Sequence, residues 1–201
     1  MPMKYLFAAI YLLFLSLIPI LSLAECSEIF TIDSTEYKIP DWWCERKIDS
    51  VDLAEPSDLV RLPERLCHKD YKIYVSVETR DNLVRMADSA MADSVHLSVK
   101  SGFRSLWYQK RLIKNRLDRI LLIEDILRVV APPGYSEHHT GRAVDFVNDT
   151  VFFGRSREYE WLKENAGSFG FIESFPKDST NTMHWEPWHW YYHKVVKDSL
   201  K

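Results

Sequence analysis

Histidine is concentrated in the last third of the chain, which holds five of the seven histidines. These five are His138, His139, His184, His189 and His193. Neutral imidazole and carboxylate oxygen are good zinc ligands, and a catalytic zinc keeps three protein ligands and one position open for water. The clustering therefore predicts a metal site formed by histidine and carboxylate side chains in this part of the sequence.

The first candidate segment, SEHHTGRAVD, begins at Ser136 and ends at Asp145. It places His138 in a loop seven residues before Asp145, which itself lies in an apolar strand. An unpaired carboxylate is costly in apolar surroundings, and a metal ion would be a suitable partner for it. Taken alone, the segment fits equally well a surface turn followed by an aspartate held by hydrogen bonds.

The second candidate segment, MHWEPWHW, places Glu186 three residues before His189. Because Pro187 favours an extended or turn conformation at Glu186, a strand end and a turn could direct both side chains into one cleft. His138, Asp145 and His189 would then hold the metal, while Glu186 would stay off it and accept a proton from water. The neighbouring tryptophans and tyrosines are interpreted as wall and core packing.

Helical periodicity predicts three helices that help to hold these segments in place. In residues 77–92 the apolar side chains of one face are Leu83, Val84, Ala87, Ala90 and Met91. A long helix is predicted over residues 106–130, capped by Ser105 and stopped by a Pro-Pro-Gly sequence. A short helix is predicted over residues 158–165, closed by Gly167.

Three strands are predicted, the first of them from the alternation of apolar and polar residues. Residues 95–100 alternate as in a half-buried strand that ends at Ser101-Gly102. Residues 141–147 predict a buried strand, and residues 182–186 predict another. Residues 25–70 show no sustained period, so we expect an irregular N-terminal segment that wraps around the rest.

Length and composition limit the classes of protein to which the chain can belong. Its 201 residues are the size of one domain. With 46% hydrophobic and 27% charged residues it is typical of a folded globular chain. The 26 basic and 29 acidic side chains give a net charge of -3, too balanced for a nucleic-acid-binding protein. We expect a monomer.

The first 24 residues are typical of a secretory signal. Lys4 precedes an apolar stretch over residues 5–21, and the small residues Ser22 and Ala24 fit a cleavage site. An uncleaved membrane anchor is one alternative, because the stretch approaches the ~20 residues of a spanning helix. A lipid-modified Cys26 is a weaker one. The prediction is an exported protein, periplasmic, in the cell envelope or secreted, with no membrane span after cleavage.

Three cysteines, Cys26, Cys44 and Cys67, lie in the first third of the chain. Export permits disulfides, so we expect one bridge and one remaining thiol, with all three pairings open. None of the cysteines has the spacing of a metal site. A catalytic cysteine is poorly supported, because none lies in the histidine-rich part of the chain.

Three strings resemble, in order and approximate separation, the zinc D-alanyl-D-alanine carboxypeptidases of the VanY type. They are SGFRS from Ser101, SxHxxGxAxD from Ser136 and EPWH from Glu186. The resemblance covers about residues 71–192. It implies an α+β fold, a compact single domain with a central, largely antiparallel sheet flanked by helices, shared with D,D-dipeptidases and the hedgehog signalling domain.

The resemblance also implies a role for individual residues. The implied zinc ligands are His138, Asp145 and His189. Glu186 is similar to the family's general base and acid. Arg104 would face the scissile carbonyl or the substrate's free carboxylate, which its forked donors suit, although a structural salt bridge is the alternative. Ser136 and Gln109 stand where the family has polar groups near the substrate terminus.

The other histidines of the cluster have simpler interpretations. His139 is expected behind the ligands or in solvent, and His184 at the wall of the cleft. His193 lies four residues after His189 and could share a helical face with it, but it is outside the motif. We therefore interpret His193 as a surface residue.

The chain is thus divided into the signal at residues 1–24, the N-terminal wrap at 25–70 and, by resemblance, a zinc peptidase domain at 71–201. The implied reaction is zinc-dependent hydrolysis of the terminal D-alanine peptide bond of peptidoglycan stem peptides. Members with the same metal motif also cleave an L,D bond, release a dipeptide or act as endopeptidases. Ser174 stands where many relatives have the arginine of Arg-Tyr-Pro, which leaves the substrate preference open. A zinc-containing cell-wall binding module without turnover is an alternative that the retained Glu186 disfavours.

Overall fold

The structure is a computed structural model that describes residues 26–119, 121–147, 150–177 and 184–193. The predicted signal at residues 1–24 lies outside the described residues. Among the helices of the described ranges, none combines the length and the apolar character that a bilayer crossing requires.

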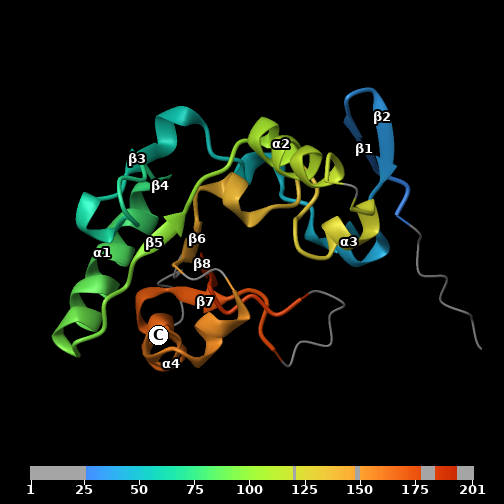
Figure 1. Cartoon of the computed structure of the whole chain (residues 1–201). Helices are drawn as coiled ribbons and strands as arrows, with labels where there is room; N and C mark the ends of the chain where they lie inside the picture. Colours follow the sequence, from blue (N-terminus) through green and yellow to red (C-terminus); the bar gives the residue numbers. More distant parts are fainter. Residues whose placement is uncertain (1–25, 120, 148–149, 178–183, 194–201) are drawn as a thin grey trace, which may run out of the picture.

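A four-stranded antiparallel sheet with the strand order β5-β6-β8-β7 lies at the centre of the fold (Figure 1). Its strands are β5 (Val99–Ser101), β6 (Ala143–Phe146), β8 (His189–Tyr192) and β7 (Phe171–Glu173). The α+β class and the antiparallel sheet implied by the motifs are therefore confirmed.

The two faces of the sheet have different surroundings. The core face of β6 and β8 carries Val144, Phe146, Trp190 and Tyr192, all in the main hydrophobic cluster. Asp145 and His189 alternate with these residues and are paired directly across the two strands. Because successive side chains of a strand point to opposite faces, burying the apolar set brings Asp145 and His189 together on the other face.

Two helices, α1 (Val77–Ala92) and α4 (Arg157–Asn165), pack against the core face. Each begins at a serine cap: the Ser76 hydroxyl accepts from the Thr79 N–H at 3.3 Å, and Ser156 caps α4 in the same way. The predicted helix over 77–92 is confirmed. One detail is wrong, because Met91 is exposed while Met86 is in the core.

The predicted helix over residues 106–130 is wrong, because the chain forms two helices, α2 (Leu106–Leu117) and α3 (Ile123–Leu127). Ser105 caps α2 as predicted, accepting from Tyr108 N–H at 3.1 Å. Ile113 of α2 and the end of α3 pack into one second hydrophobic cluster. A straight helix of this length would extend ~37 Å and could not turn back onto that cluster.

Two predicted strands and one helix end also differ from the structure. The predicted strand from residue 95 to Ser101-Gly102 is confirmed only in its last part, because Val99–Ser101 form β5 while Val95 and Leu97 are buried outside any strand. In the predicted strand over 182–186, residues 182–183 lie outside the described residues and 184–186 form no strand. The His189 N–H donates to Glu186 O at 3.0 Å and closes a turn. The strand β8 therefore begins only at residue 189.

The helix predicted over 158–165 is confirmed as α4 (Arg157–Asn165), but a 3-10 helix (Ala166–Phe169) follows it directly. Gly170, not Gly167, then takes the left-handed conformation that ends the helical segment. The other 3-10 helices are Asp41–Arg46, Ser50–Asp52, Pro56–Asp58, Glu64–Leu66, Glu137–Thr140 and Val151–Arg155.

The prediction of an irregular segment over 25–70 is wrong in part, because this segment forms a hairpin and one strand of a second small sheet. The hairpin of β1 (Ile29–Ile32) and β2 (Thr35–Lys38) lies beside α3 at the upper right of Figure 1, and β3 (Leu59–Arg61) pairs with β4 (Tyr74–Ser76). Hairpin side chains and Trp43 join the second hydrophobic cluster with α2 and α3. A disulfide joins Cys26 to Cys44, and Cys67 is buried with a free thiol.

Candidate metal centre

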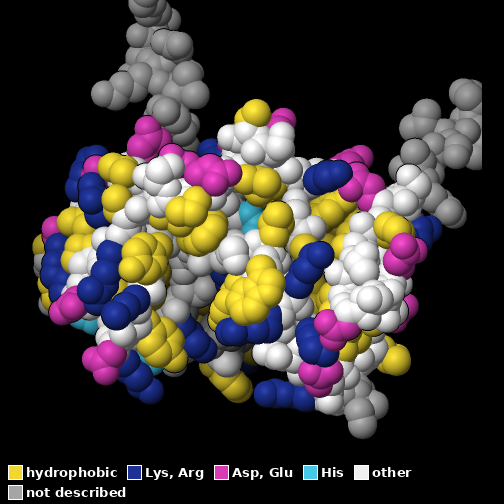
Figure 2. Space-filling model, turned by 90° about the horizontal axis from the view of Figure 1, so that it is seen from above, with side chains coloured by type: hydrophobic (Ala, Val, Ile, Leu, Met, Phe, Trp, Pro, Cys, Tyr) yellow, Lys and Arg dark blue, Asp and Glu magenta, His cyan; other side chains and the backbone are white. Residues whose placement is uncertain are grey.

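A pocket of about 680 Å³ lies between the polar face of the sheet and the layer that contains α2 and the N-terminal segment. Asp145 and His189 line it from the sheet, Gln109 from α2 and Trp43 from the N-terminal segment. Figure 2 shows this side of the molecule, with a histidine side chain visible in a hollow between hydrophobic side chains. The polar face of the sheet and the second hydrophobic cluster, through Trp43, therefore both contribute walls to one cavity.

His138 is placed by two glycines. Gly141 ends the 3-10 helix that carries His138 with a φ of +67°, and a Cβ there would lie 2.9 Å from Leu59 Cδ2. Gly102, where a Cβ would lie 2.5 Å from Tyr74 O, has a carbonyl that accepts from His138 Nδ1 at 2.6 Å. Since a carbonyl only accepts, Nδ1 carries the proton and Nε2 keeps its lone pair.

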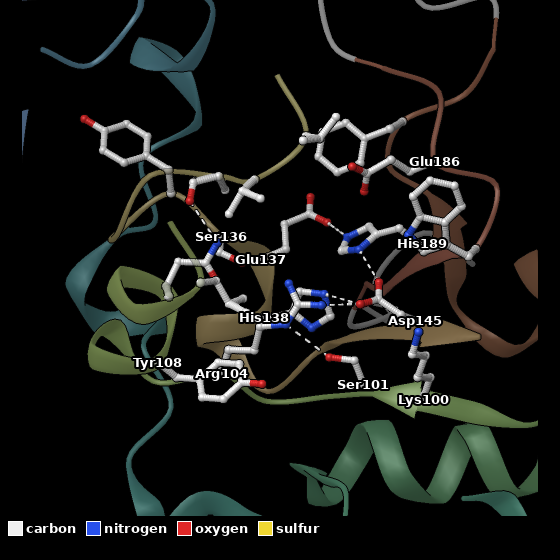
Figure 3. A pocket seen from close by; sticks show the side chains of 18 of the residues that line it. Lys100, Ser101, Arg104, Tyr108, Ser136, Glu137, His138, Asp145, Glu186 and His189 are labelled. Carbon is white, nitrogen blue, oxygen red and sulfur yellow. Dashed lines mark hydrogen bonds and ion pairs between the residues drawn. The ribbon is translucent and has the colours of Figure 1, made fainter. Parts of the chain in front are cut away.

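Asp145 lies between the two histidines (Figure 3). His138 Nε2 is 3.2 Å from Asp145 Oδ2, and His189 Nδ1 is 3.0 Å from Asp145 Oδ1. One ligand atom from each of the three residues lies within 4.8 Å of the others, and all three side chains are buried. The structure thus brings the three predicted ligands to a common point.

The charges of this cluster are set by burial and by neighbouring groups. Burial lowers the pKa of His138 to about 4, and Arg104 acts in the same direction. Burial would raise the pKa of Asp145, but the neighbouring His138 and Arg104 hold it well below its usual value. Burial would lower the pKa of His189, but hydrogen bonds to Asp145 and Glu137 raise it to about 10. In the zinc-free chain an ionised Asp145 therefore lies between a neutral imidazole, His138, and a protonated one, His189.

These residues fit a zinc ion. Among the described residues, His138 Nε2 is buried and has no hydrogen-bond partner, which is costly unless another atom contacts it. A cation between the rings would use this lone pair, the charge of Asp145 and Nδ1 of His189, whose proton it would displace into solvent. Two imidazoles and a carboxylate form a typical donor set for catalytic zinc, with a fourth position left open.

Glu186 lines the same pocket, just before the turn that leads into β8. Its N–H donates to Phe175 O at 3.1 Å and its carbonyl accepts from His189 N–H, which places the side chain beside His189 (Figure 3). Burial raises the pKa of its carboxyl to about 7. A carboxyl with this pKa can accept and return a proton near neutral pH.

Arg104 lines the pocket and forms an ion pair with Asp145. Its Nε donates to Ser101 Oγ at 3.1 Å. The salt bridge that was the alternative interpretation is thus present, and it holds the guanidinium at the edge of the metal cluster. The remaining guanidinium donors are available to a bound substrate.

Ser136 and Gln109 are both buried and both line the pocket. The Gln109 side-chain N–H donates to Ala131 O at 2.8 Å. Its Oε1 is buried without a hydrogen-bond partner among the residues that the structure describes. An acceptor left in this condition is suited to a donor from a ligand.

The remaining histidines occupy different places. His139 is buried rather than in solvent: its Nδ1 donates to Arg104 O at 2.6 Å, and its Nε2 accepts from Gly134 N–H at 3.2 Å. His139 therefore ties the backbone of Arg104 to the loop before the metal motif. His184 lines the pocket, as predicted, and His193 is exposed, as predicted.

Glu137 is a pocket residue to which sequence reasoning gave no role. It accepts hydrogen bonds from His189 and from Ser174. A usable signal was present, since Glu137 lies between two motif residues, Ser136 and His138. Trp43 was also missed, because nothing in the local sequence shows that the N-terminal segment reaches the pocket.

Comparison with known proteins identifies relatives of the chain. The family model described as VanY, D-alanyl-D-alanine carboxypeptidase, matches residues 72–195. A D-alanyl-D-alanine carboxypeptidase of Enterococcus faecium is 31% identical over 146 residues, covering 71% of this chain and 44% of the relative. The chain spans about half the length of the curated relatives it matches.

Two solved structures are also similar. LdcB, described as an LD-carboxypeptidase that recognises peptidoglycan, is 30% identical with a TM-score of 0.65, covering 82% of this chain and 83% of LdcB. A mutant of the vancomycin resistance D,D-pentapeptidase VanY from a VanB-type cassette, in complex with Zn(II), is 27% identical with a TM-score of 0.52. That match covers 67% of this chain and 84% of the VanY chain.

Proposed function

This chain belongs to the VanY family of D-alanyl-D-alanine carboxypeptidases, and from this premise we propose that it hydrolyses the terminal D-alanine peptide bond of peptidoglycan stem peptides. The observation that carries the proposal is the convergence of His138, Asp145 and His189, with Glu186 in the same pocket. The substrate class is supported by the Enterococcus faecium relative and by the peptidoglycan recognition described for LdcB.

His138, Asp145 and His189 would hold the zinc ion. Bound zinc supplies a positive charge that polarises the scissile carbonyl and makes water a stronger acid. Glu186 accepts the proton of the attacking water and then donates it to the amine of the released amino acid. Burial raises the pKa of the Glu186 carboxyl in the zinc-free chain, which makes the carboxylate a stronger base toward the proton of water.

Three further side chains are proposed to orient the substrate. Arg104 keeps donors beyond those that contact Asp145 and Ser101, and they can face either the carbonyl oxygen as it gains charge or a substrate carboxylate. Ser136 and Gln109 lie on the pocket wall, where their polar atoms would bind the end of the peptide.

We propose that the protein acts outside the cytoplasm, where the peptidoglycan substrate is located. The signal-like sequence of residues 1–24 supports export. The disulfide between Cys26 and Cys44 supports an oxidising compartment. Trp43, adjacent to this disulfide, lines the pocket, so the bridge would stabilise part of the substrate cleft.

A second candidate is an L,D-carboxypeptidase that acts on the same polymer. The overlay on LdcB, with a TM-score of 0.65, is closer than the overlay on VanY, with 0.52. Ser174, beside the pocket residue Phe175, also departs from the arginine of many relatives. Both observations concern specificity, and the metal chemistry would be the same.

Product analysis with defined muropeptides tests the proposal. Zinc-loaded protein would be incubated with a pentapeptide that ends in D-Ala-D-Ala and, separately, with the tetrapeptide that lacks the last residue. Release of D-alanine from the pentapeptide supports the proposal, and release from the tetrapeptide alone supports the L,D alternative. Release of a dipeptide would indicate a dipeptidase. Binding without cleavage of either peptide would contradict the enzyme and indicate a binding module.

A further inference from the structure

Glu137 contacts a predicted metal ligand from the side that faces away from Asp145. Its Oε2 accepts from Nε2 of His189 at 2.8 Å, while Nδ1 of the same ring lies 3.0 Å from Asp145 Oδ1 (Figure 3). The two nitrogens of the ring thus have different partners. Nε2 is directed to Glu137, and Nδ1 is directed to the point shared with His138.

The hydroxyl of Ser174 holds the Glu137 carboxylate in turn. Ser174 Oγ donates to the same oxygen, Oε2, at 2.6 Å. Ser174 follows β7, so a donor from the edge of the sheet fixes a carboxylate of the 3-10 helix that precedes β6. Ser174, which stands where many relatives have an arginine, therefore contacts Glu137.

We propose that Glu137 is a positioning residue for the metal centre, which fixes the His189 ring with Nε2–H as a donor and Nδ1 as the metal ligand, and that Ser174 secures Glu137. A ligand histidine that donates its other N–H to a carboxylate has a fixed tautomer and a more basic ligand nitrogen. One short segment of chain would thereby supply both a ligand, His138, and the group that orients another ligand. The inference rests on the proposed function for the identity of the metal.

Two other roles for Glu137 fit the geometry less well. As a ligand it would have to reach the metal, but its bonded oxygen lies on the Nε2 side of the ring, opposite the shared point. As a general base it would have to give up two hydrogen bonds on one oxygen. Glu186, by contrast, makes no side-chain hydrogen bond or ion pair with any residue in the described ranges, so it is the carboxylate available for proton transfer.

Zinc affinity tests the inference without substrate. The zinc dissociation constant would be measured by chelator competition for wild type, Glu137→Leu, Glu137→Gln and Ser174→Ala. Leucine removes the acceptor, and we expect zinc to bind ~10–100-fold more weakly, as for other outer contacts of metal ligands. Glutamine keeps an oxygen in place and should restore most of the affinity. Ser174→Ala should give a loss between those of the two Glu137 variants.

Glu173→Gln is the matched control. Glu173 is a glutamate with a buried side chain next to Ser174 that accepts from Tyr159 and Trp185 and contacts none of the three ligands. Its substitution removes a buried charge from β7, directly before Ser174. Because Glu173 does not contact the ligands, the zinc affinity should stay within about twofold of wild type. A general loss of folding would weaken zinc binding in this control as well.

The inference is overturned if folded Glu137→Leu binds zinc within about twofold of wild type, or if glutamine restores none of the lost affinity. If the leucine variant does not fold, wild-type affinity in both Glu137→Gln and Ser174→Ala would overturn it. Failure of the proposed function has a different signature, namely wild-type protein that binds zinc but leaves muropeptides intact.

Discussion

Replacing Glu186 by glutamine should stabilise the zinc-free fold at neutral pH and abolish turnover of the zinc-loaded enzyme. Burial raises the pKa of the Glu186 carboxyl from 4.5 to about 7. Ionisation of this carboxyl therefore costs more free energy in the folded protein than in the unfolded chain. Glutamine has a similar shape and no charge. The substitution therefore removes an unfavourable charge together with the group that moves the proton.

The size and sign of the stability change follow from the pKa difference. Below about pH 4.5 the Glu186 carboxyl is protonated in both the folded and the unfolded chain, so variant and wild type should be equally stable in this respect. As the pH rises toward about 7, the unfolded chain ionises first and wild type loses stability. Above that pH the variant should be more stable by about 3 kcal/mol, at ~1.4 kcal/mol for each pKa unit.

Urea unfolding of chelator-treated proteins at about pH 4, 6 and 8 measures this difference. The matched control is again Glu173→Gln. Its carboxylate accepts from Tyr159 and Trp185 and forms an ion pair with Lys163 at 3.1 Å. That variant should be less stable than wild type at about pH 8, so the two substitutions should act in opposite directions.

Equal stability of wild type and Glu186→Gln at about pH 8 would refute the reasoning on burial. A gain that persisted unchanged to about pH 4 would show that shape, not charge, is responsible. In the zinc-loaded variant we expect kcat on muropeptides to fall ~10²–10⁴-fold with zinc affinity retained. Near-normal hydrolysis would remove Glu186 as the base.

Three further predictions follow from the site and its supports. His138→Ala should lose zinc and turnover together, measured as metal content after dialysis and as muropeptide cleavage; retained stoichiometric zinc would contradict its role as a ligand. Arg104→Lys should lower kcat/KM by ~10²–10³-fold, because lysine lacks the fork that can contact Asp145 and substrate at once; an unchanged kcat/KM would limit Arg104 to a structural role. Gly141→Ala should lower the free energy of unfolding by at least ~1 kcal/mol, since its φ is +67° and a Cβ would contact Leu59; a thermal melt at the wild-type temperature would refute this.

The candidate ligands could be predicted from sequence because each lies in a short motif whose residue types carry the chemistry. His138 and Asp145 are seven residues apart, and Glu186 and His189 are three apart. The apolar residues on both sides of Asp145 also predicted a buried strand. Local pattern and local chemistry thus agreed, and the cross-strand pairing of Asp145 with His189 follows from burial of the opposite face.

The errors lie where distant parts of the chain decide local structure. The apolar pattern over 106–130 continues through the break between α2 and α3, because both helices bury their apolar side chains in one cluster shared with the N-terminal hairpin. The start of β8 depends on a turn after Glu186, which the surrounding aromatic residues do not reveal. The pairing of Cys26 with Cys44 likewise depends on how residues 26–46 pack against this cluster.

The contact of Glu137 with His189 could not be predicted from the sequence for a related reason. The two residues are 52 positions apart, and their contact requires β6 and β8 to be neighbours. From the sequence, Ser174 could be identified only as a departure from the Arg-Tyr-Pro motif. Its role becomes definable when β7 is placed at the edge of the sheet, next to β8.

Anomalous X-ray diffraction at the zinc edge, from crystals of the protein grown with zinc, tests the metal centre most directly. We predict a single strong peak bonded to His138 Nε2, an Asp145 carboxylate oxygen and His189 Nδ1, with the Glu186 carboxylate close by but not bonded. A peak elsewhere, or one bonded to His189 through Nε2, would contradict the account.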